Sequence, residues 1–248
     1  IMDLDHLEAH IDSRTRLLIL CSPHNPVGRV WKRRELEQLA EICLRHNILM
    51  ISDEIHSDFV YPDHRHIPLA SLSPEVAQNT ITCMAPSKTF NLAGLATSFV
   101  VIPNRRFREV FGNTLENVGV SNAFLGITAL EAAYRFGEEW LDELLTYLKG
   151  NLDYMQDFLR ERALGIEMKE PEGTFLTWLD CRELVTGNLG LHDFFVYKAK
   201  IMVNDGQWFG PNGSGFVRFN IGCPRALLRA GLSRIEAAVK DGSGVFAD

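Results

Sequence analysis

The sequence predicts an α/β protein: a large domain with a mostly parallel sheet and helices on both faces, followed by a smaller C-terminal α+β domain. Two observations support this prediction. Short apolar runs alternate with amphipathic helical segments through the first half, the pattern of a helix-covered sheet. After about residue 150, isolated strand-like runs and helices replace that alternation. With 248 residues, 46% of them hydrophobic, the chain is long enough to bury a core without disulfides or metal.

The first half contains four expected strands. The apolar run at residues 17–21 predicts a buried parallel strand, which ends before a turn rich in proline and glycine. Leucines spaced along residues 32–46 form one apolar face and predict a helix. Residues 48–51, 80–84 and 98–102 predict the other strands.

The second half is expected to begin with helices. Residues 121–162 carry a long apolar stripe that Gly137 and Gly150 are expected to break into two or three helical pieces. Strands are expected at residues 174–179 and 215–221, and helices at 191–199 and from Pro224 onward. The expected domains are therefore a partial large domain over 1–120, a connecting helical region over 121–150 and a small domain over 151–248.

Composition narrows the classes of partner and location. The net charge of −7 argues against nucleic acid or an anionic membrane as the partner. No apolar run approaches the roughly 18–20 residues of a membrane span. Five dispersed cysteines, with no C-x-x-C pair, indicate reduced thiols and a cytoplasmic protein.

Polar side chains follow three successive predicted strands. Asn25 follows the first strand, Asp53 the second and Lys88 the third. Ligands of open α/β sheets bind outside the carboxyl ends of strands, so these residues are expected to lie near one crevice. An amine and a carboxylate suit pyridoxal 5'-phosphate, which needs a Schiff-base lysine and a carboxylate beside its ring nitrogen. Ser87 and Thr89 flank the lysine and offer hydroxyls for the phosphate.

A metal site is the alternative interpretation of part of this region. Asp53, His56, His64 and His66 are all residue types that bind metals. Their spacing matches no known ligand pattern, so no metal is expected.

Four segments resemble the fold-type I pyridoxal-phosphate aminotransferase superfamily (class I/II), and specifically its C–S β-lyase branch, the cystathionine β-lyase group. They are Ser-Pro-His-Asn-Pro-Val-Gly at 22–28, Ser-Asp-Glu-Ile-His-Ser-Asp at 52–58, Ala-Pro-Ser-Lys-Thr-Phe-Asn-Leu-Ala-Gly-Leu at 85–95 and Phe-Val-Arg-Phe-Asn-Ile-Gly-Cys-Pro at 216–224. The four occur in the family's order and extend over most of the chain.

The resemblance implies a role for each matching residue. Lys88 is the catalytic lysine that holds the cofactor as an imine and shuttles the α-proton, and Asp53 pairs with the pyridine nitrogen. Asn25 hydrogen-bonds the ring oxygen and Ser87 contacts the phosphate. Arg218 binds the α-carboxylate of a small amino-acid substrate, a task suited to its forked guanidinium. The resemblance also implies a homodimer.

Two positions depart from the pattern of transaminases. His56 stands where a tyrosine is common, and Ala96 stands where a phosphate-binding arginine is common. Both are familiar in the C–S lyase branch. The expected activity is therefore β-elimination from cystathionine or related cysteine S-conjugates, which releases a thiol, pyruvate and ammonia. His56 then belongs to the cofactor site.

Other functions stay open at this point. An aminotransferase shares the first half of the chemistry, and a non-catalytic protein or inactive fragment could keep the fold. Chains of the resembled family begin well before the segment that matches Ile1, so a fragment lacking the N-terminal part is expected. Such a chain is expected to bind little cofactor by itself.

Overall fold

The computed structural model describes residues 2–121 and 124–243. The chain divides into two compact units, Ile1–His24 with Val30–Asp142, and Asn25–Arg29 with Glu143–Asp248. We call these the first and the second unit and describe each by itself. The domain boundaries given above remain a proposal.

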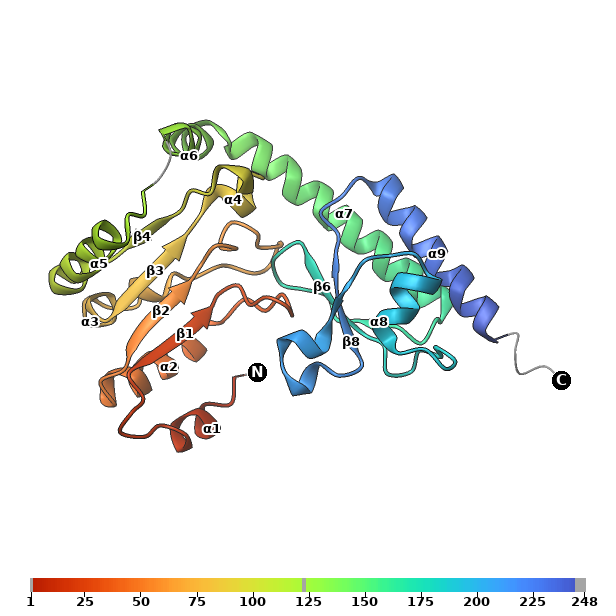
Figure 1. Ribbon diagram of the computed structural model, residues 1–248, viewed down its shortest axis with the longest axis horizontal. Coiled ribbons are helices and arrows are strands. Elements are labelled where there is room, and N and C mark those ends of the chain that lie inside the picture. The colour runs from red at the N-terminus through yellow and green to blue at the C-terminus, as the bar shows by residue number, and fades with distance from the viewer. Residues whose placement is uncertain (1, 122–123, 244–248) are drawn as a thin grey trace. The chain divides into compact units, whose positions relative to one another are not determined.

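The first unit is built on a four-stranded sheet in the order β1-β2-β3-β4 (Figure 1). The strands are β1 (Leu17–Cys21), β2 (Leu49–Asp53), β3 (Thr80–Met84) and β4 (Phe99–Val101). β1, β2 and β3 are parallel, whereas β4 runs antiparallel to β3. This agrees with the expected mostly parallel sheet, and two of the four strands have the expected bounds.

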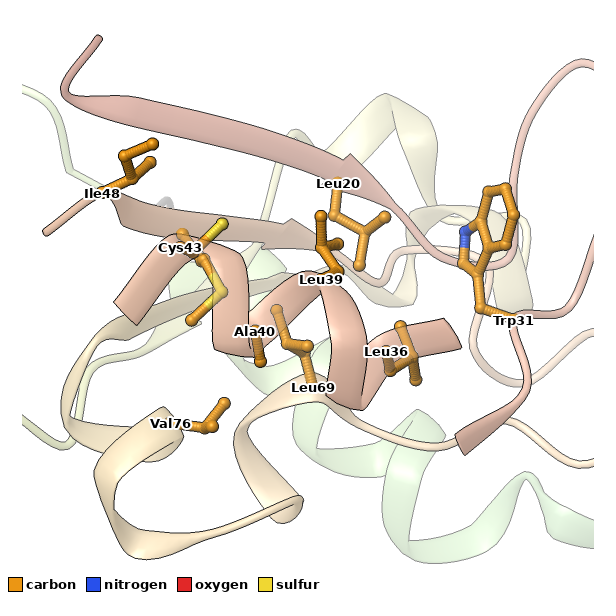
Figure 2. Packing of buried hydrophobic residues seen from close by; sticks show 10 residues of the cluster. Leu20, Trp31, Leu36, Leu39, Ala40, Cys43, Ile48, Leu69 and Val76 are labelled. Carbon is orange, nitrogen blue, oxygen red and sulfur yellow. The ribbon is translucent and has the colours of Figure 1, made fainter. Parts of the chain in front are cut away.

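One face of this sheet carries the core of the first unit. The helix α2 (Arg33–Arg45) places Leu36, Leu39 and Cys43 against the strands, as Figure 2 shows. Leu20 of β1 and Met50 of β2 point into this core, in keeping with the alternation of side-chain direction along a strand. The segment after β2 completes the cluster; the buried residues are Leu20, Trp31, Leu36, Leu39, Ala40, Cys43, Ile48, Met50, Leu69 and Val76.

Helices occupy the remainder of the first unit. α1 (Leu4–Ala9) precedes β1, and α3 (Pro74–Gln78) and α4 (Pro86–Thr89) lie on either side of β3 in the chain. α5 (Arg105–Val118) is a helix that the sequence analysis did not assign, and Asn104 begins it by accepting a hydrogen bond from the Phe107 backbone N–H. α6 (Phe124–Phe136) follows.

Gly137 separates α6 from α7 (Glu138–Arg162), as expected. The expectation of a second break at Gly150 is wrong, because α7 is continuous through this residue. A Cβ atom at Gly150 would lie 2.8 Å from a terminal nitrogen of Arg225. The absence of a side chain at Gly150 therefore leaves room for the Arg225 side chain, which packs on α7.

The second unit has an antiparallel sheet in the order β5-β6-β8-β7. The strands are β5 (Glu167–Met168), β6 (Leu176–Asp180), β7 (Asn204–Asp205) and β8 (Phe216–Asn220). β6 and β8 correspond to the two expected strands, and the two-residue strands β5 and β7 were not expected. α8 (Leu191–Asp193) continues into a single π-helical turn, Phe194–Lys198.

The core of the second unit lies between its sheet and two helices. α7 buries Leu148, Leu152 and Met155, and α9 (Arg225–Ser243) buries Leu228 and Leu232. Asn151 is fully buried in α7, and its amide donates to the backbone oxygens of Ile221 and Cys223 at 2.8 and 2.9 Å. This polar contact fixes the turn by which the chain passes from β8 into α9. No helix of the described residues is long and apolar enough to cross a membrane.

Candidate active site

Three parallel strands of the first unit end side by side. Cys21 is in register with Asp53, and Asp53 is in register with Cys83. The backbone then continues the ladder, since Ser22 N–H donates to Asp53 O and Glu54 N–H donates to Cys83 O, both at 2.9 Å. Asp53, the last residue of β2, and the α4 segment, which follows β3, therefore lie at the carboxyl ends of neighbouring strands, where open α/β sheets bind ligands.

The Asp53 carboxylate has few hydrogen-bond partners among the described residues. It is partly buried at the end of β2, and its only hydrogen bond from a described residue comes from the Ile55 backbone N–H at 3.3 Å. No described Lys, Arg or His pairs with it. A half-buried carboxylate of this kind suits a cationic group such as a protonated ring nitrogen. Burial, followed by the charges of Asp53 and Glu54, raises the pKa of the Cys83 thiol on the neighbouring strand.

Ser87 and Lys88 lie in the short helix α4, directly after β3. Lys88 is exposed and Ser87 is partly exposed. Neither the Ser87 hydroxyl nor the Lys88 amine makes a hydrogen bond or ion pair with any residue that the structure describes. Both side chains are therefore available to a ligand.

Thr89 differs from the other two residues of this motif. It is fully buried and its hydroxyl donates to Asp58 Oδ2 at 2.6 Å. The expectation that its hydroxyl serves a phosphate is therefore wrong: the side chain instead ties α4 to the turn that follows β2. Burial, together with the charge of Asp58, raises the pKa of Tyr134 to about 12.

The histidines of the 55–66 segment have separate surroundings. His56 is buried in the turn after β2, with its ring 6.3 Å from that of Phe59. His66 Nε2 lies 2.8 Å from Glu54 Oε2, inside the protein. Among the described residues, no group of three or more His, Cys, Asp or Glu side chains could hold a metal ion.

Asn25 and Arg218 meet directly in the second unit. Arg218 Nη1 donates to Asn25 Oδ1 at 2.8 Å. Since arginine only donates hydrogen bonds, the atom facing it must be the amide oxygen. The amide nitrogen of Asn25 therefore remains a hydrogen-bond donor. This is the type of group that the oxygen on the ring of pyridoxal phosphate needs.

The turn that carries Asn25 is fastened to the loop at 171–173. Arg29 forms a partly buried ion pair with Glu172 at 2.5 Å, and the backbone N–H groups of Glu172 and Gly173 donate to Gly28 O. Gly28 has a φ of +70°, and a Cβ atom there would lie 2.4 Å from the Pro171 Cβ. Only glycine fits this turn, so the motif requires it at this position.

Two further partners of Arg218 were not found from the sequence. Asn204 Oδ1 accepts from Nε at 3.2 Å and from Nη2 at 2.8 Å, and the guanidinium carbon lies 4.8 Å from the Phe209 ring centroid. The Trp178 and Phe209 rings contact edge to face. Burial lowers the pKa of Arg218. In the sequence, the only sign of a functional role for Phe209 was its place beside Trp208 in a glycine-rich loop. Nothing in the sequence marked Asn204.

Comparison with known proteins identifies the family. The model of the aminotransferase class I and II family matches residues 2–235. Cystathionine β-lyase PatB of Bacillus subtilis is 43% identical over 96% of this chain. A PLP-bound putative aminotransferase from Clostridium difficile is also 43% identical, with a TM-score of 0.92 over 96% of the chain. Cystalysin from Treponema denticola, whose structure contains pyridoxal 5'-phosphate, is 36% identical, with a TM-score of 0.93 over 97%.

The chain spans 62% of the length of each of these three proteins. The family match extends over nearly all of it and includes all four motifs, from the turn at Asn25 to the strand with Arg218. The chain therefore belongs to the class I and II aminotransferase family.

Proposed function

We propose that the complete protein is a pyridoxal-phosphate-dependent C–S β-lyase that acts on cystathionine or related cysteine S-conjugates. The main observation in support is that Asp53 ends β2 and Lys88 follows the adjacent parallel strand β3, and that neither charged group has a counter-ion among the described residues. The similarity to cystathionine β-lyase PatB and to cystalysin favours a lyase within the family.

The residues present fit pyridoxal phosphate in chemical type. When bound, the cofactor supplies an aldehyde that condenses with amines and a protonated ring that withdraws electrons from the substrate Cα. Lys88 would hold the aldehyde carbon, Asp53 would keep the proton on the ring nitrogen, and the Asn25 amide nitrogen would donate to the ring oxygen. Ser87 would donate its hydroxyl to the phosphate. His56 would complete the cofactor site.

The substrate is then handled by Lys88 and Arg218. The guanidinium of Arg218 would bind the α-carboxylate and so orient the Cα–H bond. The free amine of Lys88 would take the proton from Cα, and the sulfur would leave Cβ as a thiolate. With water, the products are a thiol, pyruvate and ammonia.

An aminotransferase is the second candidate, favoured by the similar Clostridium difficile structure. His56 and Ala96 favour the lyase, because a tyrosine and an arginine are usual in transaminases at these positions.

We further propose a cytoplasmic homodimer. In support, the five cysteines form no disulfide among the described residues, and apolar side chains of α5 and α6 are exposed.

The deciding experiment incubates the complete protein with pyridoxal phosphate and cystathionine, and separately with alanine and 2-oxoglutarate. We expect pyruvate to form from cystathionine faster than keto-acid exchange occurs. Faster exchange would replace the lyase by an aminotransferase. Absence of both activities, together with no visible absorbance of bound cofactor, would indicate a non-catalytic protein.

A further inference from the structure

Among the residues that the structure describes, only neutral groups orient the guanidinium of Arg218. Its three hydrogen bonds go to two amide oxygens, those of Asn25 and Asn204. Its guanidinium carbon lies 4.8 Å from the centre of the Phe209 ring. No described carboxylate pairs with it, so its positive charge is held in place without being neutralised.

Two donors of the Arg218 guanidinium remain unused by the described residues. A guanidinium has five N–H groups, and the three hydrogen bonds use one each on Nε, Nη1 and Nη2. One N–H on Nη1 and one on Nη2 therefore have no partner among the described residues. Two N–H groups on the terminal nitrogens are what a carboxylate needs for a two-point contact.

Asn204 is well placed to impose this arrangement. It lies in β7, directly opposite Arg218 of β8 in the strand register. Its single oxygen accepts from both Nε and Nη2, which fixes the rotation of the guanidinium about its own axis. Asp205, the next residue, is occupied in capping the following turn through the Gln207 backbone N–H.

We propose that Asn204 is a positioning residue for substrate: its neutral amide orients Arg218 and leaves the charge and two N–H groups of Arg218 for the α-carboxylate. This inference rests on the proposed function, which makes Arg218 the carboxylate-binding residue. The important property is the neutrality of Asn204. An aspartate of the same size would accept the same hydrogen bonds but would cancel the charge that the substrate requires.

The test separates orientation from charge in the cofactor-loaded complete protein. The ligand is an α-methyl cysteine S-conjugate, which has no α-proton to lose, and binding is measured by titration calorimetry. We expect Asn204→Asp to weaken binding by roughly 10- to 100-fold while thermal stability stays equal or rises, because the partly buried hydrogen bonds to Arg218 become charge-assisted. Asn204→Ala should weaken binding and also lower stability.

Two controls distinguish the sources of failure. Asn212→Asp makes the same change at an exposed position of the second unit and should leave binding within about twofold. The matched amine that lacks the carboxylate should bind the parent and Asn204→Asp proteins about equally. In kinetics with cystathionine, Asn204→Asp should raise KM more than it lowers kcat.

Arg218→Met decides whether the proposed function or this inference is at fault. If Arg218→Met does not weaken binding of the α-methyl ligand, the role of Arg218 in the proposed function is wrong. If Arg218→Met weakens binding but Asn204→Asp does not, the inference about Asn204 is overturned. A loss of stability in Asn204→Asp equal to that in Asn204→Ala would likewise overturn it, since the role would then be structural.

Discussion

Asp53 and Lys88 are charged side chains at the carboxyl ends of neighbouring parallel strands, and neither has a counter-ion among the described residues. Folded proteins usually pair a half-buried charge, because an unpaired one costs free energy. Their surroundings differ, however, since Asp53 is partly buried and Lys88 is exposed. The two residues can therefore be tested separately.

Borohydride reduction of the complete protein loaded with pyridoxal phosphate should attach the cofactor to the peptide that contains Lys88. The amine is exposed and unpaired, so it is accessible to an aldehyde. Peptide mapping by mass spectrometry locates the label. Lys88→Ala should remove it, whereas Lys32→Ala should retain it; a label on Lys32 or Lys198 would assign the cofactor to another lysine.

Replacing Asp53 by asparagine should lower turnover by about 100-fold or more while cofactor stays bound. The neutral amide can no longer stabilise a proton on the ring nitrogen, and a change of one pKa unit there is worth about 1.4 kcal/mol. Steady-state kinetics and the cofactor absorbance measure the two effects. Asp63→Asn is the matched control, because Asp63 is exposed and its φ of 73° suits asparagine. Near-normal turnover in Asp53→Asn would exclude Asp53 from the site.

At the scale of elements, Glu54 fastens the segment after β2 to the sheet. Its buried carboxylate accepts from Ser52 Oγ at 2.8 Å and the Leu69 backbone N–H at 3.0 Å, and it meets His66 Nε2 at 2.8 Å. Ser52 lies before the long 58–68 stretch, His66 lies within it and Leu69 directly follows it. Glu54 is the residue directly after Asp53 in the chain. The hydrogen bonds of Glu54 therefore also restrain the candidate site.

Glu54→Leu should destabilise the protein by about 2–4 kcal/mol, because it leaves three buried polar groups without their acceptor. Urea unfolding measures the change in free energy. Glu75→Leu, at an exposed position of α3, is the control and should change stability by about 0.5 kcal/mol or less. Limited proteolysis should also cut the 61–68 stretch faster in Glu54→Leu. A stability equal to that of the control would show that the carboxylate is not the anchor.

The elements show what sequence patterns can and cannot predict. Residues 17–21 and 80–84 have the expected bounds because an apolar run with turn residues beside it is a local signal. A local signal for α5 also exists, because Asn104 can cap a helix and Phe107, Val110 and Phe111 have helical spacing. The sequence prediction nevertheless did not include this helix. The partners of Arg218 could not be predicted, because Asn204 is 14 residues away and Asn25 is 193 residues away.

At the scale of the molecule, the described residues leave large apolar side chains exposed. Ile19 of β1 is 69% exposed, and Phe124 and Phe136 of α6 are 80% and 81% exposed. The expectation of a buried first strand is therefore only partly correct: Leu20 faces the core beside α2, whereas Ile19 points to the opposite face. Exposed apolar side chains of this size commonly mark surfaces that other protein covers.

These 248 residues, expressed alone, should therefore self-associate. Burial of apolar side chains such as Ile19, Phe124 and Phe136 is favourable by about 25 cal/mol per Å², so contact between copies lowers the free energy. Sedimentation velocity should show species larger than a monomer, and a dye that binds apolar surface should fluoresce. The triple variant Ile19→Thr, Phe124→Ser and Phe136→Ser should shift the chain toward monomer. The matched variant Ile19→Val, Phe124→Leu and Phe136→Leu keeps the apolar character and should still associate; a monomeric parent chain would contradict the argument.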